Sequence, residues 1–495
     1  MAIQNLMSLN FLVPFVAGKV NFSRAIRGLT GMPRRLLLVG HKLTAGTLAL
    51  NTLTTLSNPA DAVALLGEGS QLLAMWRAAK ANTGMGLPID VMAIAVGSGA
   101  VAASATISVA NAGANVTASG EVMLYIGGQR VSVGVTTADT SATVATKLFN
   151  AINALGTLPV TATNATPSQL VLTAKWGGTT GNDIDVCGVY YPDDSIPSSL
   201  SLTIPAMSGG AVVPDVSPVI AAMSLYRATE IVNPFTDSAN MVIFENELAT
   251  RWGRNDARDG MMCTAVRGTE ATLTTWLNTR NSPHVHTITT TKDLTSPWET
   301  AAMAGAAIET SAGTDPAQGP VSQLVGYKGP RQGDGFLIDS MNNLLVKGGS
   351  PLNIAPDYSG SLLRMVTNYK TSNSGAPDRS MAEMCWLKTM SYYRWFVVTT
   401  FQNQYNNQGY KLAQYVTQPI PGQKLMNAEL GEEIMVGIYK NFCDAGLCQN
   451  PGYYASTLRV EIDAPNGKLK IVDEPVIVTQ HYQTEVTSNV VAGQV

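Results

Sequence analysis

Segments with the patterns of strands and helices alternate in two separate stretches of the chain. In the first stretch, apolar strands at 34–39 and 89–96 flank a helical segment over 59–81, which a Gly-Glu-Gly sequence interrupts. The second stretch begins after residue 217 and contains strands near 229–232, 261–266 and 285–290 and helices near 237–253 and 269–280. Ser296-Pro297-Trp298-Glu299 has the pattern of a capping box, which predicts a further helix to about residue 311. Because strand–helix–strand crossovers place successive strands in parallel, we expect both stretches to share one mainly parallel sheet.

The region between these stretches, residues 101–213, has a different character. It is rich in Thr, Val, Ala and Gly, and its apolar residues alternate around Gly127-Gly128, which predicts a β-hairpin over 122–133. Strands are expected again at 160–163 and 170–174. One helix interrupts the strands, as helical spacing indicates for Val144, Leu148, Ile152 and Leu155. We therefore expect an inserted, mainly-β module.

The region from about residue 350 combines helices and strands. A helix dense in aromatic residues is expected over 378–401, a second helix with an apolar stripe over 427–443, and two strands over 457–462 and 468–472. The predicted organisation is an N-terminal arm (1–22), a discontinuous α/β core (23–100 and 214–349), the inserted module (101–213), an α+β domain (350–474) and a C-terminal arm (475–495).

Both chain ends have the composition of extended apolar segments. The β-branched run from Val476 onward has no obvious partner inside its own chain. An uncovered strand promotes aggregation unless a partner covers it, and adding a strand to the open edge of a neighbouring sheet solves this problem. We therefore predict that both ends join subunits to one another, through Phe11, Val13, Phe15, Val476, Val478, Tyr482 and Val486.

Charged residues are scarce, at 14% of the chain with a net charge of −3. Ordinary soluble proteins have about 25%. There is no basic patch that would bind nucleic acid, and polar residues and proline interrupt the uncharged segments 1–18 and 91–120, which disfavours membrane insertion. Hydrophobic residues reach 45%, which excludes disorder. A surface with so few charges associates readily, which favours a homo-oligomer. The five cysteines indicate mostly buried thiols in a reducing compartment.

Several weak chemical motifs are present. The Gly97–Ala102 segment, Gly-Ser-Gly-Ala-Val-Ala, resembles the dinucleotide-binding fingerprint, but strand-like residues follow it where that motif requires a helix. His284 and His286 could present two imidazoles on one strand face, but zinc needs three or four ligands. Neither a phosphate-binding P-loop nor a GxSxG nucleophile elbow is present. Cys443 and Cys448 have a possible metal-site spacing but no second cysteine or histidine pair nearby, which favours buried thiols. The EF-hand spacing is absent from the acidic segment, which favours a solvated loop over a calcium site for Asp183, Asp185, Asp193 and Asp194. We predict no enzymatic activity, no cofactor and no metal site.

Two segments of the chain resemble the contractile tail sheath proteins of Mu-like bacteriophages. The first is 58–80, NPADAVALLGEGSQLLAMWRAAK, in which Leu66 stands where that family often has phenylalanine. The second runs from Gly120 to Asp185 and includes GEVMLYIGGQRV. The order of the segments and the total length match across nearly the whole chain.

The resemblance implies an α/β core of the type called subtilisin-like in sheath proteins, a fold without protease activity. The C-terminal domain would lie innermost against a tail tube, the inserted module would project outward, and the arms would join neighbouring subunits. The subunits would assemble in the host cytoplasm as stacked hexameric rings, then contract to drive the tube through the host envelope for genome ejection. The implied partners are further copies of the chain, the tail tube protein, and baseplate and tail terminator proteins, without direct contact to nucleic acid.

Two alternatives stay open from the sequence. The chain could be the sheath of a phage-tail-like bacteriocin or of another contractile injection system. It could also be a non-contractile structural or adhesive protein of a virion, with the inserted module binding a host surface.

Overall fold

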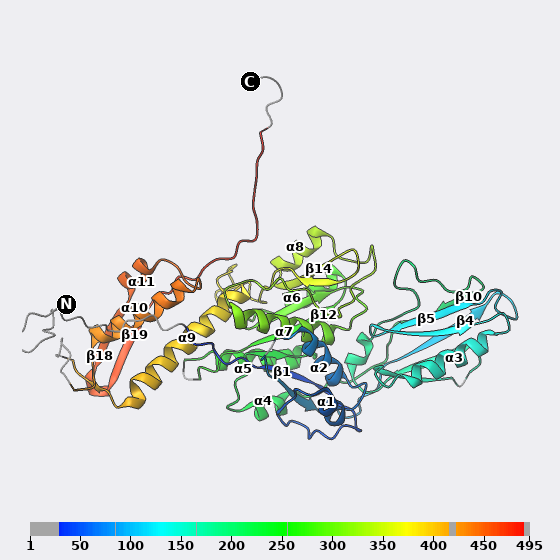
Figure 1. Ribbon diagram of the computed structural model, residues 1–495, viewed down its shortest axis with the longest axis horizontal. Helices are drawn as coiled ribbons and strands as arrows, with labels where there is room; N and C mark the ends of the chain where they lie inside the picture. The colour runs from blue at the N-terminus through cyan, green and yellow to red at the C-terminus, as the bar shows by residue number, and fades with distance from the viewer. Residues whose placement is uncertain (1–28, 85, 165, 255, 415–421, 490–495) are drawn as a thin grey trace, which may run out of the picture. The chain divides into compact units, whose positions relative to one another are not determined.

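The structure, a computed structural model, describes residues 29–84, 86–164, 166–254, 256–414 and 422–489 (Figure 1). The predicted N-terminal arm, 1–22, lies outside the described residues. The chain divides into two compact units. We call Met32–Thr399 together with the segment from Ile477 onward the large unit, and Thr400–Val476 the small unit.

The large unit is built on an eight-stranded sheet with the order β15-β14-β13-β12-β11-β1-β3-β2. Neighbouring strands from β14 to β3 pair in parallel, whereas β2 and β15 pair antiparallel at the two edges. The predicted parallel sheet that combines both stretches is therefore confirmed, because β1 pairs with both β3 and β11. The strands are β1 (Leu36–His41), β2 (Thr54–Thr55), β3 (Ile89–Ile94), β11 (Glu230–Val232), β12 (Met261–Arg267), β13 (Val285–Thr290), β14 (Gly349–Ile354) and β15 (Gly360–Leu362).

The sheet continues beyond residue 349, where the sequence pattern placed the end of the core. β14 pairs in parallel with β13, with Thr287 opposite Gly349, and β15 then closes this edge. The compact unit itself continues to Thr399. Pro351 and Asn353 interrupt the apolar pattern of β14, and such residues are depleted in strands. The sequence therefore gave no strand signal at this position.

Helices cover both faces of the parallel sheet. On β1, Leu36 and Leu38 pack in one buried cluster with α1 (Pro59–Leu66), α2 (Gln71–Asn82) and α7 (Pro297–Thr314). Leu37 and Val39 pack in a second cluster on the opposite face, with α4 (Ser217–Met223) and α5 (Ser238–Arg251). A third, smaller cluster joins α6 (Glu270–Asn278) and α8 (Ile338–Val346). Every residue of β1 is buried, as expected for a strand covered on both faces.

The start of α7 departs from its prediction. Pro297 occupies the first helical turn as expected, and the carboxylate of Glu299 accepts a hydrogen bond from the backbone N–H of Ser296. The Ser296 side chain makes no capping hydrogen bond, and its Oγ is buried without a partner among the described residues. Only half of the predicted capping box therefore forms.

The inserted region folds as two small sheets around one helix, in agreement with the predicted mainly-β module (cyan in Figure 1). One sheet has the order β10-β4-β8-β7 and the other β6-β5-β9. The helix α3 (Ser141–Ala154) contacts strands of both sheets. The strands are β4 (Ser104–Asn111), β5 (Gly120–Ile126), β6 (Gln129–Val135), β7 (Val160–Thr163), β8 (Gln169–Ala174), β9 (Val186–Cys187) and β10 (Leu200–Thr203).

The long helix α9 (Met384–Gln404) crosses the boundary between the units at Thr400. It begins six residues after the predicted start at 378, because the preceding residues form a turn and an isolated bridge between Val366 and Glu383. Its first half is buried and its second half is largely half-buried or exposed.

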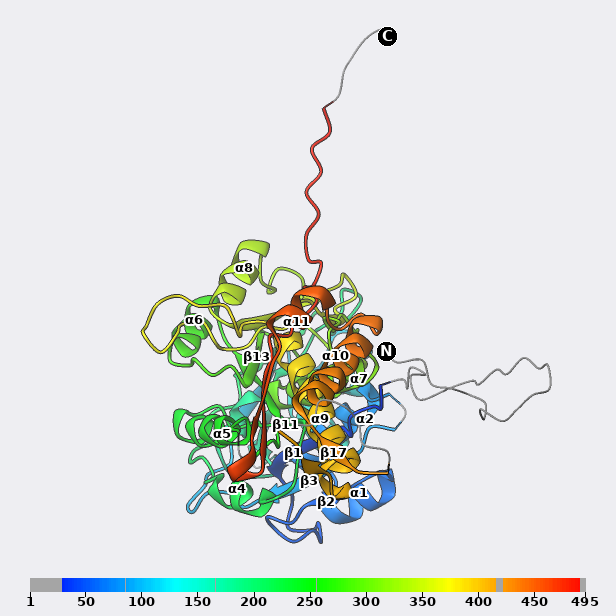
Figure 2. The ribbon, with the colours of Figure 1, turned by 90° about the vertical axis from the view of Figure 1, so that its left-hand side faces the viewer.

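The small unit joins helices to a hairpin. α10 (Ala428–Asp444) packs on α11 (Pro451–Thr457) and on the antiparallel pair β18 (Arg459–Asp463) and β19 (Lys468–Val472). Figure 2 shows the hairpin strands as long antiparallel arrows. The rings of Tyr439 and Tyr454 stack with a centroid distance of 3.7 Å and an interplanar angle of 2°. A short parallel pair, β16 (Lys411–Leu412) and β17 (Leu425–Met426), lies before α10 in sequence.

Candidate functional site

The weak motifs of the sequence have structural roles. The segment Gly97–Ala102 leads into β4, a strand, so the helix that a dinucleotide-binding motif requires is absent between 101 and 111. The uncharged stretch 91–120 contains most of β3, all of β4 and the first residue of β5. No helix in the described part of the chain is both long enough and apolar enough to cross a membrane.

The two histidines near β13 do not act as a pair. The His284 ring stacks on Trp252, with centroids 4.9 Å apart, whereas Nε2 of His286 lies 3.2 Å from Oε1 of Glu230. Burial lowers the pKa of His284 to about 4 and that of His286 to about 3, so both imidazoles are neutral near pH 7.

The cysteines and the acidic loop are also structural. All five cysteines are unpaired, and four of them are buried, as predicted. The Asp194 carboxylate accepts hydrogen bonds from the backbone N–H groups of Tyr190 and Tyr191, at 3.0 and 2.8 Å. Asp183 and Asp185 were expected in a solvated loop, but they are half-buried, and burial raises the pKa of both. The backbone carbonyl of Asp183 accepts a hydrogen bond from Nη1 of Arg267 at 2.9 Å.

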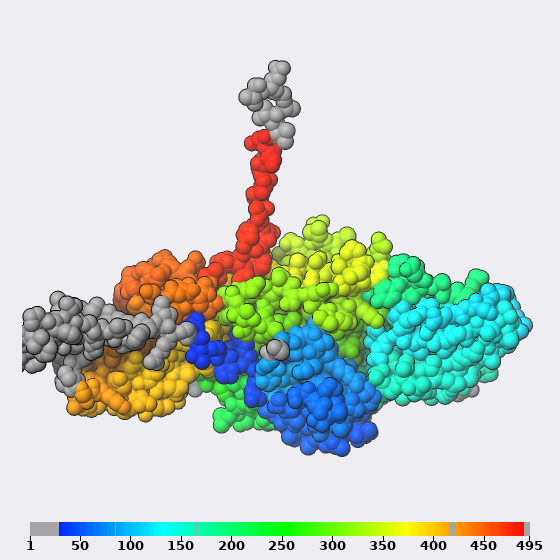
Figure 3. All heavy atoms as spheres, in the orientation of Figure 1, coloured from blue at the N-terminus to red at the C-terminus, as the bar shows by residue number. Residues whose placement is uncertain are grey.

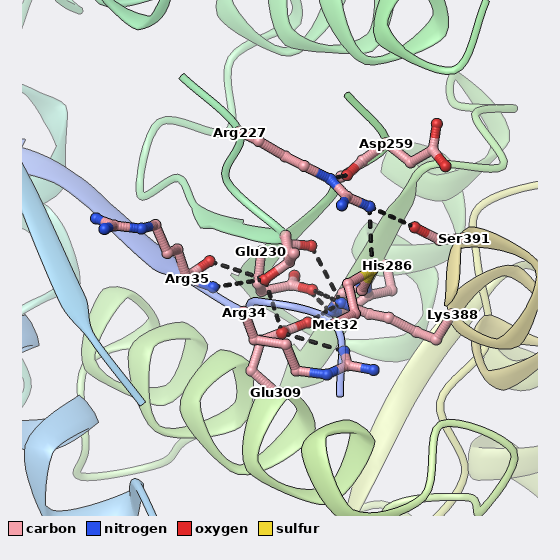
Figure 4. A network of polar contacts seen from close by, with 12 residues as sticks. Met32, Arg34, Arg35, Arg227, Glu230, Asp259, His286, Glu309, Lys388 and Ser391 are labelled. Carbon is pink, nitrogen blue, oxygen red and sulfur yellow. Dashed lines mark hydrogen bonds and ion pairs between the residues drawn. The ribbon is translucent and has the colours of Figure 1, made fainter. Parts of the chain in front are cut away.

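A buried network of charges lies between the parallel sheet and α9 (Figure 4). Nζ of Lys388 on α9 donates to Oε2 of Glu230 at 2.5 Å, to the Thr229 carbonyl at 3.2 Å, and to Glu309 of α7. Nη1 of Arg34 lies 3.3 Å from the second carboxylate oxygen of Glu309, which also accepts from the Thr229 hydroxyl at 2.8 Å. The side chains of Glu230 and Glu309 are fully buried, and that of Lys388 is 4% exposed.

The positive and negative charges of the network compensate one another inside the protein. Burial raises the pKa of Glu230, and Lys388 opposes this shift. Burial acts in the same direction on Glu309, but Lys388 and Arg34 together outweigh it and lower the Glu309 pKa. Two cations thus face two carboxylates. Removing one partner of such a buried pair costs about 3–5 kcal/mol, because the other charge stays buried without compensation.

Three groups in this region could in principle hold a metal ion. Ligand atoms of Glu230, Cys263 and His286 lie within 4.8 Å of one another, and all three residues are buried. However, Lys388 already supplies the cation for Glu230, and a divalent ion would add positive charge to a balanced network. The group also lies near the amino ends of the strands, whereas α/β proteins bind ligands at the carboxyl ends. We therefore interpret it as structural, and the expected absence of a metal stays a prediction.

This network was not predicted from the sequence, although the sequence contains a signal for it. In a chain with 14% charged residues, Glu230 and Lys388 stand inside segments that are otherwise apolar or aromatic. A charge in such a segment must find a buried partner. The sequence does not reveal which partner it finds, because the network joins residues up to 275 positions apart.

The predicted C-terminal arm is partly held by its own chain. In the small unit, the backbone N–H of Val476 donates to the Tyr439 hydroxyl at 2.9 Å, and its carbonyl accepts from the Gln449 N–H at 2.9 Å. In the large unit, Tyr482 donates to Oε2 of Glu383 at 3.0 Å. The expectation that the run from Val476 onward lacks a partner in its own chain is therefore wrong for residues up to Tyr482.

The described residues beyond Tyr482 are uncovered. Residues 483–489 are all exposed and have no regular structure, and Val486 is 79% exposed. Figures 1 and 3 show this segment extended away from the body of the large unit. Val478 is half-buried. The other predicted arm residues, Phe11, Val13 and Phe15, lie outside the described residues.

The described residues thus define an α/β protein with an inserted mainly-β module and a buried charge network between its parallel sheet and α9. No model of a known protein family matches the chain. The chain is similar to a Mu-like prophage FluMu tail sheath protein from Haemophilus influenzae, with 29% identity over 455 residues and 92% of each chain covered. This similarity confirms the resemblance to the tail sheath proteins of Mu-like phages, and with it a structural function in a tail sheath.

The chain is also similar to two solved structures of sheath tail proteins. A sheath tail protein from Listeria innocua is 10% identical, with a TM-score of 0.48 over 92% of this chain and 97% of that chain. A sheath tail protein from Desulfitobacterium hafniense is 10% identical, with a TM-score of 0.47 over 94% of this chain and 100% of that chain.

Proposed function

We propose that this chain polymerises as stacked hexameric rings around a tail tube and that contraction of the polymer drives the tube through a host envelope. The observation that supports this most directly is the exposed C-terminal segment 483–489, which extends from a folded body. This chain also matches a tail sheath protein over 92% of its length, which makes a further copy of the chain the proposed partner of this segment.

The exposed segment has the properties of a strand that a second copy would receive. Backbone N–H and C=O groups that remain unpaired at a sheet edge favour pairing with another chain. The hairpin β18–β19 offers such edges, because among the described residues these two strands pair only with one another. A two-stranded sheet is marginally stable alone, so strands added from neighbouring copies would stabilise it.

The scarcity of charge also fits a polymer. With 14% charged residues and a net charge of −3, little electrostatic repulsion separates neighbouring copies. Heterologous contacts between copies of one chain generate rings or helical tubes. A kinetic barrier can hold an extended form whose contracted interfaces have lower free energy, so contraction needs no nucleotide.

The resemblance to tail sheath proteins also suggests a role for each part of the chain, and these roles are included in the proposal. The parallel sheet corresponds to the subtilisin-like sheath domain, the small unit faces the tube, and the inserted module faces outward. The partners are further copies of the chain, the tail tube protein, and baseplate and tail terminator proteins, and assembly takes place in the host cytoplasm. The proposal includes no enzymatic step.

Negative-stain electron microscopy of the purified full-length chain tests this function. We expect hollow tubes at high protein concentration. Variants that lack residues 1–20 or 483–495 should stay unpolymerised while their thermal unfolding temperature stays close to that of the full chain. Long tubes from either truncated chain would contradict the role of that arm, and a full-length chain that stays monomeric at every concentration would contradict the function itself.

A further inference from the structure

Three side chains hold the C-terminal segment on the large unit, and we call them the tail clamp: Arg364, Glu383 and Tyr482. Oη of Tyr482 donates to Oε2 of Glu383 at 3.0 Å, and the guanidinium carbon of Arg364 lies 4.0 Å from the centre of the Tyr482 ring. Arg364 also donates to the other carboxylate oxygen of Glu383. Each member of the clamp therefore contacts the other two.

The chain order explains how the clamp is positioned. Arg364 follows β15 at the edge of the parallel sheet, and Glu383 directly precedes α9. The carboxylate of Glu383 is 5% exposed and the Arg364 side chain is 28% exposed, so the partners of Tyr482 are fixed by the body of the unit. Two residues before Tyr482, Oε1 of Gln480 accepts from the backbone N–H of Gly319 at 2.8 Å.

The chemistry of the clamp favours a tight hold. A hydrogen bond to a carboxylate is stronger than one between neutral groups, and a guanidinium over an aromatic ring adds a cation–π attraction. Burial and the neighbouring Cys385 and Glu383 raise the pKa of Tyr482, so its hydroxyl stays protonated and remains a donor. Arg364 keeps its charge, because Glu383 raises its pKa against the effect of burial.

The described chain is exposed throughout from His481 onward, and Tyr482 itself is 37% exposed, but contacts with the body of the large unit continue as far as Tyr482. Residues 483–489 are exposed, and among the described residues their hydrogen bonding is limited to Thr484, whose Oγ1 lies 2.9 Å from Nε2 of His481. Val486, in the middle of this segment, is 79% exposed. Tyr482 is thus the last residue of the segment that its own body holds.

We propose that the tail clamp is the fixed attachment point of the C-terminal arm, so that the chain up to Tyr482 belongs to its own subunit and only the residues after Tyr482 engage a second copy. This inference rests on the proposed function in one respect, namely that a second copy receives the arm. If a neighbouring copy pulled on that arm, the force would act on the contacts of Tyr482 with Glu383 and Arg364. Of the predicted arm residues that the structure describes, only Val486 then remains available to a neighbour.

Proteolysis of the monomer tests the clamp without any assembly. Chymotrypsin cleaves after tyrosine and phenylalanine, so release of residues 483–495, measured by mass spectrometry at low protein concentration, reports how often Tyr482 leaves the clamp. A synthetic peptide of residues 476–495 gives the rate for an unheld site. We expect the full chain to be cut after Tyr482 at least about tenfold more slowly than the peptide, because a closed clamp excludes the protease.

Substitution of Tyr482 by phenylalanine keeps the cleavage site and the ring over Arg364 but removes the hydrogen bond to Glu383. We expect Tyr482→Phe to be cut about fivefold faster than the unmodified chain, the effect of losing about one hydrogen bond. Arg364→Met should accelerate cleavage similarly. The matched control is Tyr453→Phe, which removes another hydroxyl–carboxylate bond, the one to Glu474 at 2.6 Å, and should leave cleavage after Tyr482 unchanged.

A Glu-specific protease supplies a control inside the same molecule. Glu485 lies beyond the clamp and is exposed, so cleavage after it should proceed at the same rate in all variants and close to the peptide rate. Equal rates after Tyr482 in the full chain and the peptide would overturn the clamp. So would a Tyr482→Phe rate equal to that of the unmodified chain.

Assembly then separates the clamp from the proposed function. If the full chain forms tubes and the clamp is confirmed, the chain that ends at Tyr482 should fail to polymerise, and Tyr482→Phe should form tubes that dissociate at lower denaturant concentration. Tubes from the chain that ends at Tyr482 would overturn the assignment of the later residues to a second copy. A full chain without tubes, but with a protected Tyr482, would instead contradict the proposed function and leave the anchoring intact.

Discussion

Nζ of Lys388 lies 2.5 Å from Oε2 of Glu230, and both side chains are at least 96% removed from solvent. The two residues are 158 positions apart and join the first half of α9 to the start of a central strand. Because a buried ion pair tolerates little displacement, this contact fixes α9 on the parallel sheet. Any movement of the helix that breaks the contact would leave these two buried charges without each other as partners.

The first prediction concerns this ion pair. Lys388→Met should lower the free energy of unfolding by about 3–5 kcal/mol, because Glu230 and Glu309 would lose their shared cation. The matched control is Lys292→Met, which removes a lysine that is 71% exposed and paired with Asp334 at 2.7 Å. Its cost should be below about 1 kcal/mol. Urea unfolding of both variants measures the difference, and equal effects would contradict a structural role for the network.

The second prediction concerns pH. Burial lowers the pKa of His284 to about 4, from about 6.5 in an unfolded chain. Between these values the unfolded chain binds the proton and the folded chain does not, so the contribution of His284 to stability is complete above pH 6.5 and is lost as the pH falls toward 4. The loss amounts to about 1.4 kcal/mol per pH unit.

The substitution His284→Phe isolates this effect, because phenylalanine keeps the stack on Trp252 and cannot be protonated. The variant should lose less stability than the unmodified chain between pH 6.5 and 4.5, as measured by urea unfolding at each pH. His481→Phe is the control, since His481 is exposed. Parallel pH profiles for His284→Phe and the unmodified chain would be inconsistent with a neutral, buried His284.

The third prediction concerns the anchor of Val476 in the small unit. Tyr439→Phe removes the hydroxyl that accepts from the Val476 N–H at 2.9 Å and donates to the Gln449 carbonyl at 2.6 Å. A partly buried N–H that loses its acceptor costs about 1–3 kcal/mol, whereas the stack on Tyr454 persists. Amide hydrogen exchange should be faster at Val476 in the variant, and unchanged protection there would count against this anchor.

The fourth prediction uses two glycines in different surroundings. A Cβ at Gly260 would lie 2.3 Å from the Ala228 carbonyl oxygen, which belongs to the backbone of the sheet region and cannot move aside. Gly260→Ala should therefore destabilise the protein by about 2–4 kcal/mol. A Cβ at Gly437, inside α10, would meet no atom within 4 Å. Gly437→Ala should stabilise it by about 0.5–1 kcal/mol. Thermal unfolding measures the change in stability of both variants. A Gly260→Ala variant as stable as the unmodified chain would show that the contact with Ala228 can relax.

Local chemistry in the sequence was sufficient for many elements. Asn58 caps α1 with its side chain accepting from the Ala60 N–H, and Pro59 opens the helix at its predicted start. The spacing of Val144, Leu148 and Ile152 matches the buried face of α3. Such signals are readable because capping and helical periodicity involve residues within a few positions of one another.

Elements whose pattern depends on distant partners were not readable in this way. Pro351 and Asn353 interrupt the apolar pattern of β14, and this segment forms a strand because its backbone pairs with β13. The tail clamp could not be predicted from the sequence for the same reason, since Tyr482 contacts Glu383, which is 99 positions away. In the sequence, the run from Val476 to the end shows one uniform β-branched character, and nothing in it marks Tyr482 as a boundary.

By itself, the sequence determined the alternation of strands and helices, the inserted β module, the scarcity of charge and the resemblance to sheath proteins, because each of these depends on neighbouring residues or on composition. The tertiary structure alone decided which charges meet under α9 and where the C-terminal segment leaves its own subunit. Both depend on pairing between residues that are far apart in the chain, and the energy of a buried charge or a clamped side chain is set by the partner that folding brings to it.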